Sequence, residues 1–461
     1  MSNGLAKHLL KPFFLCMLAA PCYAQGEQDR ELRSELAELR ALAQGLQARI
    51  DNLEKRLTPP APGNPAAAPP SALPAAAATT PTATGPLAGV LGSTTVNLAV
   101  DGYYGYNFNA PIGRVNLLRA YDVSSNSFSL NQANLVLENA PDPGNGKRFG
   151  ARLDLQFGQS TETLQGNPAN EPRPEIYRNI FQAYGTYVAP IGDGLTIDFG
   201  KWSSSIGIEG NYTKDQVNYS RSFWFDYLPF YHMGVRTSYK VNDKLALNYW
   251  VTNGTQQSEA FNSFKDELFG FNLLPTKTVS WTVNYYFGQE HPDVQYFPNG
   301  GAPANAPEQQ GVPFEPISPA LKGRLHIFDS YATWQTTPKL MLAVDADWVI
   351  ERANLNSSPA ETAGGAGYAR YQFTPRIALG TRAEYLNDRN GLFSSTPQSL
   401  KEGTVTGDYK FGDGFLLRLE WRRDLSNHAY FYTDTQGLLS NHQTTATVGL
   451  IWWFGPKQGA W

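Results

Sequence analysis

From about residue 96 to the end of the chain, apolar and polar residues alternate with a period of two. In the segment 340–348, for example, Val344 and Trp348 lie on the apolar side of the alternation, while Asp345 and Asp347 lie on the polar side. Successive side chains of a β-strand point to opposite faces, so this pattern predicts strands with one apolar and one polar face. Runs of about nine such residues are long enough to cross a bilayer as tilted strands.

The segments between these predicted strands alternate between short and long. Short polar turns are expected at 190–194, 241–244, 336–339, 374–375 and 412–414. Longer, irregular loops are expected near 109–129, 158–179, 203–231, 252–277, 351–365, 386–401 and 423–443. Such alternation is typical of a closed barrel whose two rims face different compartments. The predicted fold class is therefore all-β: a transmembrane, antiparallel, up-and-down β-barrel.

Fifteen strands are clear from the pattern, and the short–long alternation fails once, over 288–324. If this segment held no strand, the two strands that flank it would run in the same direction. We therefore expect one weak strand within 288–324. It would bring the total to 16, an even number of the kind that bacterial single-chain barrels have.

The composition excludes other classes of protein. Aromatic residues make up 13% of the chain, yet the mean hydropathy is −0.38. No apolar run reaches the ~18 residues that a spanning helix needs, so a helical membrane protein is excluded. A barrel resolves this combination, because only every second residue of a strand faces lipid. The net charge of −4 argues against a nucleic-acid partner.

Residues 1–24 have the pattern of a secretory signal peptide. Lys7 and Lys11 precede a short apolar stretch, and Cys22 and Ala24 are small residues at the positions that signal peptidase reads. Both cysteines of the chain, Cys16 and Cys22, would leave with this segment. A mature chain without thiols would have neither disulfide bonds nor thiolate metal sites.

Residues 25–57 are expected to form a coiled-coil helix in the periplasm, because both apolar positions of a heptad are filled over about four heptads. These positions are Leu32, Leu39, Leu46 and Leu53, and Leu36, Ala43, Ile50 and Leu57. An amphipathic helix packed on its own domain is the alternative. Residues 58–89 are rich in Pro and Ala and predict an extended linker, which leaves 90–461 for the barrel.

Several short motifs occur in a fixed order in the first half of the predicted barrel. They are Asp101-Gly102-Tyr103-Tyr104, Phe128-Ser129-Leu130-Asn131-Gln132-Ala133, Gly200-Lys201-Trp202, Ile206-Gly207-Ile208-Glu209, Asn218-Tyr219-Ser220-Arg221-Ser222 and His232-Met233-Gly234-Val235. Through them the chain resembles the OmpL-like β-barrel porins (the porin-2 group), and its second half matches in pattern only. The resemblance implies an outer-membrane barrel with a channel function.

Charged residues on the polar side of the predicted strands are the candidates for lining a pore. They are Arg152, Asp154, Asp198, Asp345, Asp347, Arg370, Arg382, Glu384, Arg418, Glu420 and Arg422. Opposed charges of this kind bias which ions pass, although each residue could instead pair with a neighbouring strand. The loop 203–231 is rich in aromatic residues and is expected either to fold inward, with Glu209 and Arg221 at a constriction, or to pack at the rim or a subunit contact.

The function predicted from the sequence is passive diffusion of small hydrophilic solutes or ions through an outer-membrane, porin-like channel that needs no cofactor. A homotrimer is expected by analogy with porins. The alternative is a structural protein that reaches peptidoglycan through its N-terminal coiled coil. An enzyme is not expected: only His428 and His442, in one loop with Asp424 and Asp434, suggest a base with an orienting carboxylate, and no nucleophile or metal motif accompanies them.

Overall fold

The computed structural model describes residues 92–164, 171, 173–412 and 414–457. The predicted signal peptide, coiled coil and most of the linker lie outside the described residues. The helices of the described part are short: α3 is Ser160–Leu164, α4 is Pro174–Tyr177 and α5 is Phe223–Tyr227. None of them has the length and apolar character needed to cross a bilayer.

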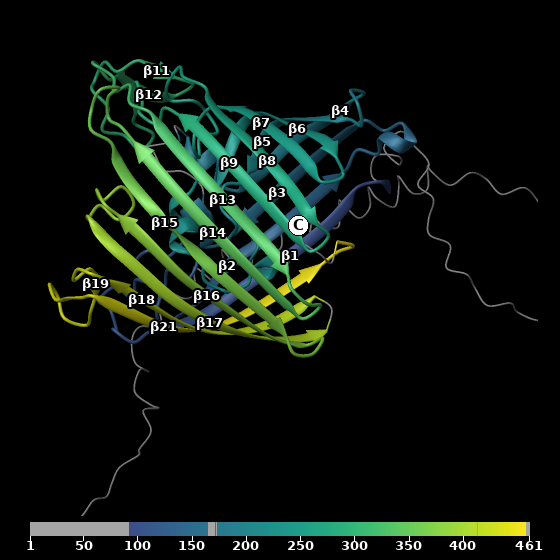
Figure 1. Ribbon diagram of the computed structural model, residues 1–461. Helices are drawn as coiled ribbons and strands as arrows, with labels where there is room; N and C mark the ends of the chain where they lie inside the picture. Colours follow the sequence, from purple (N-terminus) through teal and green to yellow (C-terminus); the bar gives the residue numbers. More distant parts are fainter. Residues whose placement is uncertain (1–91, 165–170, 172, 413, 458–461) are drawn as a thin grey trace, which may run out of the picture. The chain divides into compact units, whose positions relative to one another are not determined.

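Sixteen antiparallel strands close into one barrel, in which each strand pairs with its neighbours in the chain and β1 pairs with β21 (Figure 1). The strands are β1 (Thr95–Asn107), β2 (Ser127–Asn139), β3 (Phe149–Phe157), β4 (Ile180–Ala189), β5 (Leu195–Ser203), β6 (Tyr231–Asn242), β7 (Leu245–Thr252), β8 (Asp266–Thr276), β9 (Val279–Gly288), β13 (Leu325–Gln335), β14 (Leu340–Glu351), β15 (Ala360–Gln372), β16 (Ile377–Asp388), β17 (Gln398–Gly412), β18 (Phe415–Ser426) and β21 (His442–Phe454). Closure leaves no unpaired edge, which a bilayer does not tolerate. The predicted fold class and strand number are confirmed.

The position of the sixteenth strand, however, was predicted wrongly. β9 pairs directly with β13, and the segment between them forms a small separate sheet of β10 (Val294–Tyr296), β12 (Val312–Pro316) and β11 (Glu308–Gln309). The strand that the pattern missed is β8, inside the segment 252–277 that we expected to be a loop. Its alternation is blurred because Leu268, buried in the apolar cluster of the interior, and Leu274, near the turn to β9, are apolar residues on the inward side. The turn to β9 is only two residues long.

The loops separate cleanly into two rims. Short turns connect β2–β3, β4–β5, β6–β7, β8–β9, β13–β14, β15–β16 and β17–β18, and we call this end the short-turn rim. The remaining connections are long and form the long-loop rim, where β19 (Phe431–Tyr432) pairs with β20 (Leu439–Ser440). β1 begins and β21 ends at the short-turn rim. The predicted asymmetry of the loops is therefore present in the structure.

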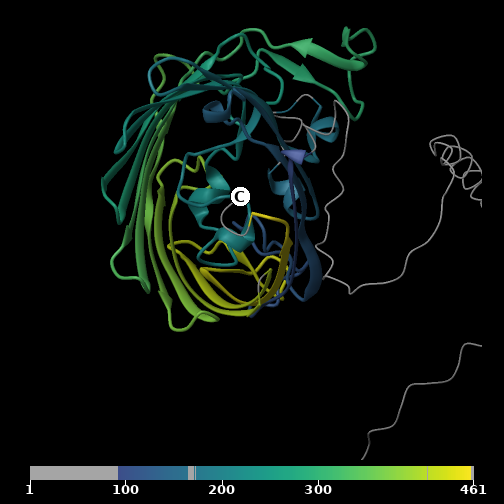
Figure 2. The same ribbon diagram turned by 90° about the vertical axis from the view of Figure 1, so that its right-hand side faces the viewer.

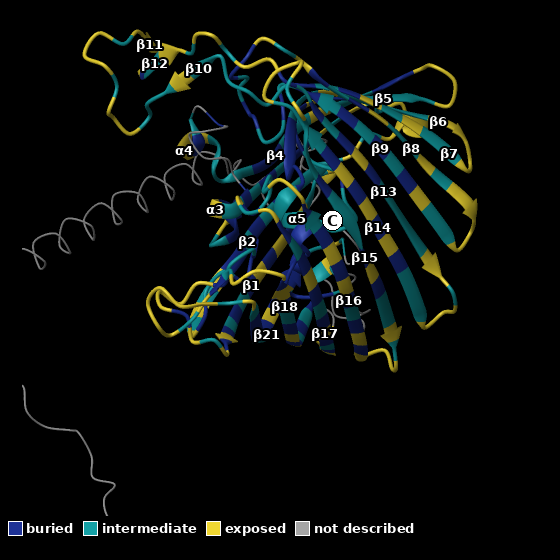
Figure 3. Ribbon diagram, turned by 60° about the vertical axis from the view of Figure 1, so that its left-hand side comes forward, coloured by how far each residue is buried: buried dark blue, intermediate teal, exposed yellow. Residues whose placement is uncertain are grey.

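The outer face of the barrel is apolar and the inner face is polar, the reverse of a water-soluble sheet. Exposed and buried residues alternate along the strands (Figure 3). In β17, Val405 and Tyr409 point outward and are exposed, whereas Thr404 and Thr406 point inward and are buried. Such alternation suits a wall with lipid on one side.

Substitution of Val405 by arginine tests this assignment. Val405 lies at the middle of β17 and is 43% exposed on the outer face. A charge at the bilayer midplane costs about 2–4 kcal/mol, so Val405→Arg should lower the free energy of unfolding in lipid vesicles by that amount. Val405→Leu serves as the control and should change it little. Equal stability of the two variants in lipid would contradict a lipid-facing position.

Candidate functional site: the barrel interior

The loop between β5 and β6, residues 204–230, folds into the barrel, and we call it the inner loop. Figure 2 shows its teal segments, including a short helix, within the ring of strands. Ser222 caps α5 by accepting a hydrogen bond from the main-chain N–H of Phe225 at 3.0 Å. The inner loop contacts the wall on several sides, and its main chain is held by charged side chains of the strands.

Carboxylates of the wall accept hydrogen bonds from main-chain N–H groups of the inner loop. Glu384 of β16 binds the first two residues of α5, at 2.8 and 2.9 Å. Glu420 of β18 binds the N–H groups of Tyr219 and Ser220 at 2.6 and 3.0 Å. Asp329 of β13 binds the N–H of Gly207 at 2.9 Å. A carboxylate at the start of α5 is also favourably placed for the N–H groups that begin a helix.

Three arginines of the same wall donate to carbonyl oxygens of the inner loop. Arg382 binds the carbonyls of Ser220 and Arg221 at 2.9 and 3.1 Å and forms an ion pair with Glu209 at 2.7 Å. Arg418 binds the carbonyls of Thr213 and Asn218, and Arg422 binds that of Arg221. Their side chains are almost completely buried, so these arginines fix the loop instead of facing open solvent.

On the other side of β21, the strands β1 to β3 hold the inner loop through further side-chain hydrogen bonds. The Tyr219 hydroxyl donates to Asp101 at 2.9 Å, and the Tyr212 hydroxyl donates to Asp154. Gln132 donates to the side chain of Asn211 at 2.8 Å. The inner loop is therefore bound to β1–β3 as well as to β13–β18.

Towards the long-loop rim the interior is apolar. Phe223, Trp224 and Leu228 of the inner loop pack in one cluster with side chains that point inward from the strands. The strand residues of this cluster are Trp202, Trp250, Leu268, Tyr286, Leu325, Ile327, Val349, Leu386 and Leu400. The polar alternation seen at mid-barrel therefore does not extend to this end, because the inner loop supplies an apolar surface for the wall to cover.

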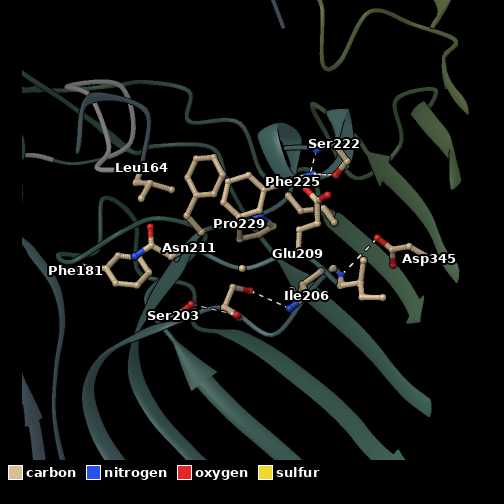
Figure 4. A pocket seen from close by; sticks show the side chains of 16 residues that line it. Leu164, Phe181, Ser203, Ile206, Glu209, Asn211, Ser222, Phe225, Pro229 and Asp345 are labelled. Atoms are coloured by element: carbon tan, nitrogen blue, oxygen red, sulfur yellow. Dashed lines mark hydrogen bonds between the residues drawn. The ribbon is translucent and has the colours of Figure 1, made fainter. Parts of the chain in front are cut away.

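Close to the wall the inner loop is tightly packed. Figure 4 shows Glu209 directed at the main chain near Ser222 and Asp345 directed at the loop main chain beside Ile206. The cavity enclosed there measures only about 20 Å³.

Desolvation by burial in this loop raises the pKa of Asp226, on α5, to about 7, so this carboxyl changes charge near neutral pH.

Two larger cavities lie elsewhere in the interior. One of about 490 Å³ lies toward the short-turn rim and is lined by Lys214, Asp215, Gln216, Val217, Met341, Arg370, Gln372, Pro375, Arg376, Ala378, Asp408, Lys410, Leu416, Arg418 and Trp453. Five of these residues are basic and two are acidic. The other, of about 160 Å³, lies toward the long-loop rim and is lined by Tyr227, Leu228, Pro229, Thr255, Gln256, Glu290, Leu325, Ile327, Val349 and Glu351. Its two charged residues are both acidic.

The eleven candidates for pore lining all lie on the inner face, but their surroundings differ. Arg382, Glu384, Arg418, Glu420 and Arg422 hold the inner loop, as described above. The others form smaller groups near it. Arg152 pairs with Asp154, Asp198 with Arg236, Arg370 with Asp408, and Asp345 and Asp347 lie beside Asp329.

Of the two residues expected at a constriction, the structure brings Glu209 to Arg382 but gives Arg221 a different place. The Arg221 guanidinium is fully buried, donates to the carbonyls of Gly210, Tyr219 and Asn211, and lies 4.6 Å from the ring centre of Tyr121. It therefore holds the inner loop together and does not line a passage. The expectation for Arg221 was wrong because its carbonyl partners depend on how the loop folds.

Sequence reasoning missed the uncharged part of the inner wall. Asn248 donates to Asn272 at 2.7 Å, and Asn272 donates to Thr282 at 2.8 Å. Ser280 and Thr333 are hydrogen-bonded at 2.8 Å. These five residues, the polar stripe, follow one another across β7, β8, β9 and β13, and most are partly exposed. The period-two alternation already places these residues on the inner face, so their position was predictable. The candidates for pore lining, however, included charged residues alone.

The histidines of the last long loop do not assemble with the acidic residues beside them. Asp424 is buried and binds Arg119 at 2.5 Å and Arg422 at 2.7 Å. His442 Nδ1 lies near the Ser440 hydroxyl and the Asn441 side-chain oxygen. Among the described residues, no hydrogen bond or ion pair joins a histidine to Asp424. Asp424 therefore forms ion pairs with arginines of the interior and does not orient a histidine.

A comparison with protein families shows which family this chain belongs to. The family model described as "Putative beta-barrel porin-2, OmpL-like" matches residues 93–454, the whole barrel. The chain belongs to this family. Membership in the porin-2 family places the chain among the β-barrel proteins of the bacterial outer membrane, in agreement with the resemblance found in the sequence. No curated protein matches the sequence.

The porin-2 barrel is also similar to solved structures of other outer-membrane proteins, each matched over 78% of this chain. An anion-selective porin from Comamonas acidovorans is 8% identical, with 99% of its chain covered and a TM-score of 0.49. The channel DcaP of Acinetobacter baumannii is 11% identical, with 97% covered and a TM-score of 0.49. OprB of Pseudomonas putida is 12% identical, with 94% covered and a TM-score of 0.48.

The anchoring of the inner loop can be tested by removing two carboxylates together. Glu384→Gln with Glu420→Gln removes the charge from hydrogen bonds to four main-chain N–H groups. Hydrogen bonds to charged groups contribute about 1.5–3 kcal/mol each and neutral ones about 0.5–1.5 kcal/mol, so each bond weakens by about 1–1.5 kcal/mol. Each carboxylate holds two N–H groups, so amide exchange at 219–224 should become roughly 100-fold faster. Hydrogen–deuterium exchange with mass spectrometry measures this. The matched control is Glu308→Gln with Glu315→Gln, in the exposed sheet at the long-loop rim. It should leave amide exchange at residues 219–224 unchanged.

Proposed function

We propose that this protein is a channel for the passive diffusion of small hydrophilic solutes or ions across the bacterial outer membrane. The observation that carries the proposal is the combination of a closed 16-strand barrel with an inner wall that stays polar and partly exposed beside the inner loop. Barrels of 16–18 strands are wide enough to leave an aqueous passage, and the inner loop narrows this one.

The passage that we propose runs along the polar stripe and past the inner loop. Asn248, Asn272 and Thr333 offer hydrogen-bond donors and acceptors without charge, which suits hydrated solutes of either sign. The cavity near the short-turn rim carries more basic than acidic residues and would favour anions at that end. Glu290 and Glu351 give the cavity near the long-loop rim the opposite character.

The orientation that we propose places the short-turn rim in the periplasm. β1 begins at this rim, so the N-terminal segments would enter the periplasm there. Short periplasmic turns and long extracellular loops are the rule in outer-membrane barrels. Within this proposal the heptads at 25–57 would join three chains and could also bring the assembly to peptidoglycan.

Planar-bilayer recording of the purified protein tests the channel function directly. We expect discrete conductance steps that persist without any energy source, and a reversal potential in a salt gradient that gives the ion preference. A protein that inserts in folded form and stays silent would refute the proposal. Deletion of 25–89 should leave the conductance of the barrel unchanged, while loss of co-sedimentation with peptidoglycan would assign that contact to the N-terminal region.

The role of the basic cavity is tested by Arg376→Gln with Lys410→Gln. A unit charge about 10 Å from a passing ion contributes roughly 0.4 kcal/mol in water, so removing two should lower the anion-to-cation permeability ratio about two- to four-fold at low salt. The control replaces two exposed basic residues of the long-loop rim, Lys265→Gln with Lys322→Gln. Identical reversal potentials for both double variants would remove the cavity from the ion path.

A further inference from the structure

Three aspartates meet on the inner face of β13 and β14. Asp329 and Asp347 are direct cross-strand partners, and Asp345 lies two residues from Asp347 on the same face. Each offers one carboxylate oxygen, and these atoms all lie within 4.8 Å of one another. The three residues are only 2%, 4% and 4% exposed. The strand register thus brings three acidic groups into one small, buried volume.

This cluster lacks a positive partner in the described part of the chain. The arginines of the interior are engaged with other carboxylates: Arg382 with Glu209 and Glu402, and Arg418 with Asp408. No Lys, Arg or His among the described residues forms an ion pair with any of the three aspartates. Buried carboxylates without a counter-charge are strongly unfavourable, so the charge of the cluster must be neutralised, and a bound cation would do so.

The hydrogen bonds of the cluster indicate where that ligand would bind. Asp329 accepts from the N–H of Gly207 at 2.9 Å and from the side chain of Asn284 at 2.7 Å, and one oxygen of Asp345 accepts from the N–H of Ile208 at 3.5 Å. Both oxygens of Asp347 and the second oxygen of Asp345 are buried without a hydrogen-bond partner. Among the described residues, no main-chain group of the inner loop donates to Asp347, and its neighbours in the cluster are Asp345 and its cross-strand partner Asp329.

We propose that Asp329, Asp345 and Asp347 form a binding site for a calcium ion. All donors are hard carboxylate oxygens, which is the ligand type that Ca²⁺ prefers, and no imidazole or thiol accompanies them in this cluster. Ca²⁺ accepts six to eight oxygen ligands in flexible geometry, so three carboxylates and water molecules complete its shell. The stricter octahedral demand of Mg²⁺ fits three neighbouring carboxylates less well.

The site has a structural consequence for the inner loop. Two of its ligands, Asp329 and Asp345, also hold the main chain of Gly207 and Ile208, where the loop enters the barrel interior. Along the inner face of β14, Met341 lines the cavity near the short-turn rim and Val349 lines the other. The calcium ion lies between the two cavities and braces the loop that separates them.

Calcium binding to the full chain tests the proposal, independently of whether the protein conducts. The protein is refolded from urea into detergent, so that no lipopolysaccharide brings cation sites, and is then treated with a chelator. Isothermal titration with Ca²⁺, and luminescence of Tb³⁺ as a calcium substitute, should both give one site per chain. Asp347→Asn should weaken binding at least ten-fold, because it removes the carboxylate that has no other partner.

Two further measurements keep the outcome decisive. The matched control Asp434→Asn, in the last long loop, should bind Ca²⁺ like the unmodified chain. The heat-dependent shift in gel mobility that folded barrels show checks each variant, and Asp345→Asn serves if Asp347→Asn does not fold. No binding by the unmodified folded chain would overturn the proposal, and so would folded Asp347→Asn and Asp345→Asn that both bind Ca²⁺ as tightly as the unmodified chain. In the first case, infrared absorption of protonated carboxyl groups would identify protons as the neutralising ligand.

Discussion

The main chain of an irregular loop inside a barrel carries N–H and C=O groups that no neighbouring strand can satisfy. Each such group left buried and unpaired costs about 1–3 kcal/mol. In this barrel, charged side chains of the wall satisfy these groups. Glu384 and Glu420 accept hydrogen bonds from N–H groups of the inner loop, and Arg382 and Arg418 donate hydrogen bonds to its carbonyl oxygens. The charges of the wall therefore fix the inner loop, and the passage that we propose is confined to the part of the wall that the loop leaves uncovered.

This division gives the interior two kinds of surface. The side from β14 to β18 is charged, buried and bound to the inner loop, whereas the polar stripe on β7 to β13 is uncharged and partly exposed. Toward the long-loop rim, Phe223 and Trp224 of α5 close the space with an apolar cluster. In the proposed channel, a solute that passes the inner loop would meet hydrogen-bonding groups on one side and fixed charge at either end, in the two cavities.

The sequence predicts most of the wall and little of what fills it. The period of two places Asp345, Asp347 and Arg418 on the inner face, because the alternation of a strand is fixed by its geometry. It does not reveal that Glu209 reaches Arg382, since that contact depends on the folded course of a long loop. The strand β8 was missed for a local reason: its inward Leu268 packs in the apolar cluster and so breaks the polar side of the alternation.

One contact that we did not predict, between Asp329 and Asp347, could have been predicted from the sequence. A short turn fixes the register of the two strands that it joins, and the turn after β13 places Asp329 opposite Asp347. By contrast, the carbonyl partners of Arg221 could not be read from the chain, because they lie on the same irregular loop and no periodic rule governs them.

The direct pairing of β9 with β13 also bears on how such a barrel can diverge. The segment between them forms its own small sheet and adds no strand to the barrel. The entropy of closing a loop grows slowly, by about 0.6 kcal/mol for each doubling of its length. Chain can therefore be gained or lost at this point of the long-loop rim at little thermodynamic cost. The surface of the long-loop rim can change in size and shape while the barrel wall keeps its register.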